Sequence, residues 1–230
     1  MTEEAWLSSQ DHQPMLEFLQ GRGSDRGLRL FAVACCQNYG HLLADERCRQ
    51  AVQVGERFAE GLATAGERSE AEDAVWRAVE SGELWEEGAG PACAYCCYQN
   101  EDGSYPSGIA REAANQMLVA AGDEISTDER YESECRTLAG LLRCLFGNPF
   151  DPVTADRSWR TATAVSLAQG IYDERAFDRL PILADALQDA DCNDSRILGH
   201  CRSGGPHARG CWVVDLILKK MSFALPMPTI

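Results

Sequence analysis

Apolar residues recur at three- and four-residue steps along most of this chain. Leu28, Phe31, Cys35 and Tyr39 fall on one helical face, and a second such stripe runs through residues 48–62. We find no convincing run of alternating β-branched residues, although residues 100–106 would allow a short strand or hairpin. The pattern predicts an all-α protein, an irregular multi-helix bundle of about nine helices.

Helix starts and stops divide this pattern into segments. Ser69-Glu70-Ala71-Glu72 has the form of a capping box. Single N-caps are predicted at Asp45, Ser107, Thr127 and Asp194. The clearest break is residues 147–152, where two prolines cannot continue a helix. We therefore expect a single helical domain over residues 1–230, with a candidate subdomain boundary at 146–153.

The eleven cysteines constrain the compartment. Met1–Leu7 is acidic and has no apolar segment, so we predict no export signal and a cytoplasmic location in which thiols stay reduced. Cys93, Cys96 and Cys97 include a CxxC spacing, but structural zinc usually takes two such pairs and no second one is present. Core packing is the favoured interpretation of these three, with metal binding and redox chemistry as alternatives.

The net charge of −15 excludes some partners. Residues 44–134 hold 21 acidic side chains against 7 arginines. Such a field repels phosphate backbones, so we expect no non-specific nucleic-acid binding. No stretch approaches the roughly 20 apolar residues that span a bilayer, so no membrane insertion is expected. Solvated helix faces explain the acidity most simply, and a docking surface for a basic partner is the alternative.

The segment 199–212 carries the most distinctive chemistry. Cys192, His200, His207 and Cys211 are zinc-ligand types within 20 residues, although their spacing matches no standard zinc pattern. Zinc is therefore the one candidate cofactor, while packing of Cys211 beside Trp212 and histidine bonds to loop carbonyls would explain the same residues without an ion.

Two further interpretations concern the same segment. Its local charge is positive, and Arg202, His207, Arg209 and Trp212 are candidates for binding an anion or a partner near a helix N-terminus. A thiolate nucleophile at Cys211, with His207 as base and Asp215 as the orienting group, is the catalytic alternative.

Several segments resemble an uncharacterised protein family abundant in planctomycetes, for which no activity is established. The resembling segments are Trp6–Leu7, Pro14–Leu19, Leu28–Cys36, His41–Arg47, Phe146–Phe150, Ile171–Leu187, His200–Arg202 and Gly210–Asp215. They leave out the acidic middle of the chain, and Lys219-Lys220-Met221 stands where the family has Gly-Lys. Residues 183–187 are also similar to a short helical companion domain of bacterial repeat proteins, which implies an interaction module.

These observations lead to one expectation and one alternative. We expect a non-enzymatic helical protein-interaction module or assembly subunit with a protein partner. The alternative is a metal- or anion-dependent enzyme that uses the histidines, cysteines and aspartate of residues 200–215.

Overall fold

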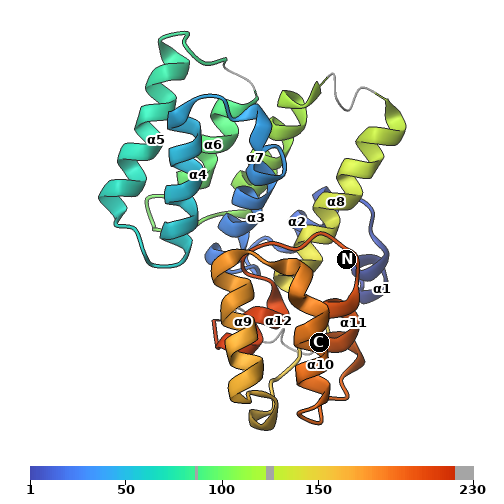
Figure 1. Ribbon diagram of the computed structural model, residues 1–230. Helices are drawn as coiled ribbons and strands as arrows, with labels where there is room; N and C mark the ends of the chain where they lie inside the picture. Colours follow the sequence, from blue (N-terminus) through green and yellow to red (C-terminus); the bar gives the residue numbers. More distant parts are fainter. Residues whose placement is uncertain (86–87, 123–126, 221–230) are drawn as a thin grey trace. The chain divides into compact units, whose positions relative to one another are not determined.

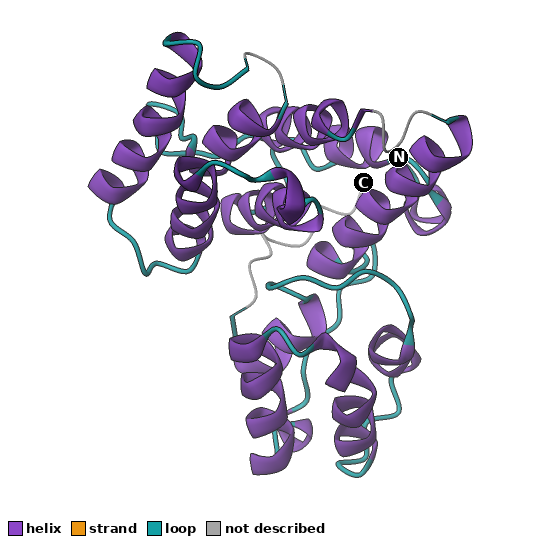
Figure 2. Cartoon of the chain, turned by 45° about the horizontal axis from the view of Figure 1, so that its top comes forward, coloured by secondary structure: helices purple, strands orange, loops and turns teal. Residues whose placement is uncertain are grey.

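A computed structural model describes residues 1–85, 88–122 and 127–220. These residues form twelve α-helices and three short 3-10 helices joined by loops, and no strand occurs among them (Figure 2). The all-α prediction is confirmed, and the predicted number of about nine helices was too low. No described helix is both long and apolar enough to cross a bilayer.

Two of the unpredicted helices lie at the start of the chain. α1 (Glu3–Ser8) and α2 (His12–Phe18) have six and seven residues. A helix of two turns repeats its apolar positions only once, so periodicity gives little signal at that length. Their caps, Thr2 and Asp11, each accept a hydrogen bond from the backbone two or three residues on.

The cap predictions have mixed outcomes. Asp45 caps α4 (Glu46–Ala59), Asp194 caps α11 (Ser195–Arg202), and the Thr127 hydroxyl accepts a hydrogen bond from the backbone N–H of Arg130. The predicted capping box at 69–72 was wrong, because the reciprocal pair is Thr64 and Glu67 and α5 (Ala65–Glu80) begins there. Ser107 is the first residue of α7 (Ser107–Ala120) and not its cap.

The chain divides into two compact units, residues 1–139 and 140–230, which we call the N-terminal and C-terminal units. The division falls within α8 (Asp128–Phe146) and not at the proline-rich segment 146–153. In the N-terminal unit, α6 (Ala89–Cys97) contacts α4, α5, α7 and α3 (Asp25–Asn38), as Figure 1 shows. Nearly all of α6 is buried, as expected for a helix that is apolar on every side.

The C-terminal unit places its helices around a small core. α9 (Ala162–Glu174) contacts α10 (Leu180–Gln188) and α12 (Trp212–Leu218), and α11 contacts α10 and α12 (Figure 1). Leu180, Leu183, Ile171 and Val213 are fully buried there. Four cysteines, at positions 144, 192, 201 and 211, belong to the same core.

Candidate metal centre

Two cysteines and two histidines of the C-terminal unit converge on one point. Their ligand atoms, one per side chain, all lie within 4.8 Å of one another. We call this set the four-ligand group; it consists of Cys144, His200, His207 and Cys211. Both thiols are buried and both imidazoles are half-buried. Among the described residues, no other group of three or more such side chains converges in this way.

Each ligand comes from a different local structure. Cys144 lies in the last turn of α8, and Gly147, the residue after that helix, has a φ of +59°. A Cβ on Gly147 would approach the Trp212 ring to 3.3 Å, so glycine there lets the end of α8 pack against the start of α12. Cys211 is the residue before α12 and His200 lies in the last turn of α11.

His207 is carried by the loop between α11 and α12, and the preceding Pro206 fixes that loop against α8. The closest approach is at Gly140, where a Cβ would stand 2.7 Å from a Pro206 ring carbon. The His207 ring meets the His200 ring edge-on, with centroids 5.0 Å apart. The loop therefore brings its histidine directly between two helix ends.

Two of the nitrogen–sulfur separations are close to the edges of a tetrahedral zinc site. The His200 Nε2–Cys211 Sγ distance is 3.2 Å, and the Cys144 Sγ–His207 Nδ1 distance is 3.6 Å. Zinc bonds of about 2.3 Å to sulfur and 2.0–2.1 Å to nitrogen imply tetrahedral N–S edges of roughly 3.5 Å. Two sulfurs and two nitrogens also form one of the common ligand sets for structural zinc.

A neighbouring backbone group sets the protonation of His207. Its Nε2 lies 3.4 Å from the carbonyl oxygen of Ser203, which can only accept a hydrogen bond. In the neutral ring, a hydrogen bond to this carbonyl places the proton on Nε2 and leaves Nδ1, which lies 3.6 Å from Cys144 Sγ, free to bind a metal. A backbone carbonyl that fixes the tautomer in this way is the usual second partner of a metal-binding histidine.

The electrostatics of the group favour a thiolate at Cys211. Burial alone would raise the pKa of Cys211, but hydrogen bonds from Cys144 and the neighbouring His200 and His207 hold that pKa well below its ordinary value. The hydrogen bond to Cys211 and burial together raise the pKa of Cys144. Burial opposes protonation of His207, yet its contact with Cys211 raises the pKa of the imidazole.

The structure brings together three of the four metal ligands named from the sequence, His200, His207 and Cys211. Cys192 is buried in the same core but is not one of the converging residues. Cys144, which sequence reasoning missed, completes the group from 56 positions before His200. The one sequence feature that set Cys144 apart is its position two residues after Leu142, a position that lies off the apolar stripe of α8.

The residues proposed for anion binding each have contacts of their own in the structure. Arg202 donates hydrogen bonds to Asp185 at 2.7 Å and to Gln188 at 2.8 Å. Arg209 stacks over the Tyr172 ring, 5.0 Å from its centroid, and donates to the Tyr172 carbonyl. Trp212 is buried, with its ring 5.4 Å from that of His200. Both arginines therefore have partners in the structure, and the binding of an anion by these residues stays a prediction.

Comparison with known proteins found no relative: no family model matches the chain, and no curated protein or solved structure matches it. The resemblance to a planctomycete family stays a prediction. What can be said of function therefore rests on the geometry of the four-ligand group.

Proposed function

We propose that this protein is a non-enzymatic helical interaction module whose C-terminal unit is held together by one structural zinc ion. The observation that carries the proposal is the convergence of four ligand atoms within 4.8 Å. The ligands come from α8, α11, the following loop and the residue before α12, so a shared ion would join four separate segments of the unit.

A structural role fits the number and burial of the ligands. Catalytic zinc sites supply three protein ligands and leave a fourth position for water or substrate, whereas structural sites supply four. The four-ligand group would saturate a tetrahedral ion. Cys211 is fully buried, and a nucleophile must be reached by its substrate, so the thiol is poorly placed for covalent catalysis. Asp215, the third member of the catalytic alternative, is buried on α12 and is not one of the converging residues.

The test is the metal content of the full chain purified under reducing conditions. We expect one zinc per chain, and Co²⁺ in its place should give the intense visible bands of a tetrahedral thiolate complex. Cys144→Ala with Cys211→Ala should abolish both signals because it removes both sulfur ligands. An added anion such as azide should leave the Co²⁺ spectrum unchanged, because no coordination position is open.

Matched controls come from the other two buried cysteines of the C-terminal unit. Cys192→Ala and Cys201→Ala make the same change of volume in the same core, and both variants should keep one zinc per chain. Loss of zinc from Cys192→Ala alone would show that the ligand set is different. A Co²⁺ spectrum that responds to azide would replace the structural role with an open, catalytic one.

A further inference from the structure

The N-terminal unit contains a cavity of about 610 Å³, which is within the size range of ligand sites in proteins. The cavity lies where the first residues of α4 and α6 meet the loop after α5 and the end of α7. Its lining is mostly apolar and includes Leu42, Ala44, Cys48, Leu84, Trp85 and Ala120. We call it the Trp85 pocket.

Trp85 itself is 88% exposed, although it lines the pocket. Val119, beside the lining residue Ala120, is 54% exposed. A large aromatic side chain in water next to an apolar hollow is typical of a binding surface, because tryptophan contributes most when a partner covers it. The exposure of Trp85 favours a partner that covers the rim over a small molecule enclosed in the cavity.

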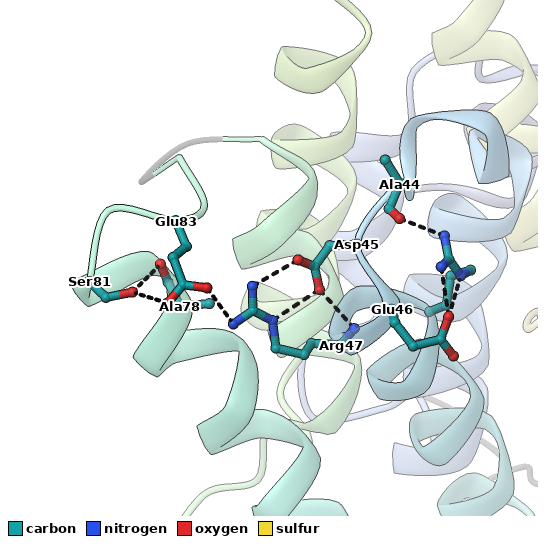
Figure 3. Close-up of polar contacts among 8 residues, drawn as sticks. Ala44, Asp45, Glu46, Arg47, Ala78, Ser81 and Glu83 are labelled. Carbon is teal, nitrogen blue, oxygen red and sulfur yellow. Dashed lines mark hydrogen bonds and ion pairs between the residues drawn. The ribbon is translucent and has the colours of Figure 1, made fainter.

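The polar border of the pocket is already paired. Asp45 accepts hydrogen bonds from the guanidinium and backbone N–H of Arg47, and Arg47 also donates to Glu83, which accepts from Ser81 (Figure 3). The hydrogen bond from Arg47 lowers the pKa of Asp45 to about 2, so its carboxylate is charged. Arg49, which donates to the Ala44 carbonyl, pairs with Glu46, so three carboxylates stand against two guanidiniums and leave this border with a net negative charge.

The surrounding charge is strongly acidic. The described residues 80–85, which lead into the pocket, contain two glutamates and no basic residue. Over the whole N-terminal unit, 26 acidic side chains stand against 11 basic ones, whereas the C-terminal unit has ten of each. The full net charge of −15 therefore belongs to the unit that contains the pocket, and the complementary partner is basic.

We infer that the Trp85 pocket docks a basic peptide segment of a partner protein, with an apolar side chain of that segment in the cavity and Trp85 packed over it. The carboxylates around the pocket would attract the flanking arginines and lysines of the segment. This inference rests on the interaction part of the proposed function and not on zinc, because the four-ligand group belongs to the other unit.

The experiment measures binding of a short fluorescent peptide of alternating arginine and leucine to the full, zinc-loaded chain. We expect saturable one-to-one binding that weakens as salt rises. Trp85→Ala should weaken it at least tenfold, as for other central tryptophans. Leu62→Ala is the matched control, since Leu62 is 65% exposed beyond the opposite end of α4, about 20 Å away along the helix. That variant should change binding less than twofold.

Two further peptides separate specific docking from charge attraction. Serine in place of leucine removes the anchor, and glutamate in place of arginine reverses the charge; both should abolish saturable binding. Equal binding of the serine peptide, or binding unchanged by Trp85→Ala, would overturn the inference. So would self-association of the chain that Trp85→Ala abolishes, because the occupant would then be a second copy. Zinc content without peptide binding would leave the metal site standing and remove only this inference.

Discussion

The two units use the same residue, buried cysteine, in different ways. The N-terminal unit holds seven of the eleven cysteines, all buried and free. There the thiols meet one another and backbone carbonyls: Cys36 and Cys96 are 3.6 Å apart, and Cys97 donates to the Ala51 carbonyl at 3.1 Å. Hydrogen bonds from Cys36 and Cys48 lower the pKa of Cys93 to about 5. Yet these thiols do not converge as a set of three or more around one point.

The C-terminal unit has only four cysteines, but two of them face two imidazoles. The number of cysteines in a unit therefore does not indicate whether that unit has a metal site, because a thiol also packs well as a small apolar group. The two units differ in where their histidines lie relative to the cysteines. His200 and His207 lie beside Cys211, whereas the buried ring of His12 in the N-terminal unit lies beside Asp11 and Asn115.

The strongest test of this comparison is removal of zinc. A chelator should unfold the described part of the C-terminal unit and leave that of the N-terminal unit protected from hydrogen exchange. The expected effect is large because binding of structural zinc, about 10–16 kcal/mol in zinc-finger peptides, exceeds the usual stability of a small domain. Hydrogen exchange followed by mass spectrometry reads the two units separately. Equal loss of protection in both would contradict the assignment of zinc to one unit.

Two glycines give an intermediate effect, one in each unit. A Cβ on Gly55 would stand 2.6 Å from the Cys96 carbonyl oxygen, and one on Gly140 would stand 2.7 Å from the Pro206 ring. Each alanine should cost about 1–3 kcal/mol, because the crowded atoms are held by backbone. Denaturant unfolding should show the loss for both, whereas only Gly140→Ala should weaken zinc binding, since Pro206 precedes His207.

The controls for the glycine pair are Gly108→Ala in α7 and Gly170→Ala in α9, where a new Cβ meets nothing within 4 Å. Both lie within helices, so alanine should leave stability unchanged or raise it by about 0.5–1 kcal/mol. A loss of zinc affinity in Gly55→Ala as large as that in Gly140→Ala would argue that the two units respond as one.

The smallest effect is the pH response of His12. Burial lowers the pKa of His12 below its ordinary 6.5, although nearby Asp11 and Asn115 oppose this. The unfolded chain then binds a proton more readily than the folded chain, so stability falls as pH falls below about 6.5. One such group changes the free energy of unfolding by at most about 1.4 kcal/mol per pH unit.

The measurement is denaturant unfolding of the full chain, followed in the N-terminal unit, between pH 7 and pH 5. The free energy of unfolding of the natural chain is compared with that of His12→Phe. The variant should lose this part of the pH dependence, because phenylalanine fills the buried site without titrating. A slope that is the same in His12→Phe would assign the acid sensitivity to other groups. Acid also protonates zinc ligands, so zinc content measured in parallel keeps the response of the C-terminal unit separate.

Local features of the sequence determined much of this protein. Helical periodicity and the absence of alternating runs predicted the all-α class, and Asp45, Thr127 and Asp194 marked helix starts, because such signals act within one or two turns of the chain. The charge of the N-terminal region was also visible without a structure. His200, His207 and Cys211 stood out because they lie within twelve residues of one another.

Only the tertiary structure decided that Cys144 and not Cys192 lies beside the two histidines. Cys192 is nearer in sequence, but distance along the chain does not govern which helix faces meet. Cys144 reaches the histidines because Gly140 admits Pro206 and Gly147 admits Trp212 at close range, two contacts that depend on packing between distant segments. The same holds for the Trp85 pocket, whose lining comes from four parts of the chain that no local pattern relates.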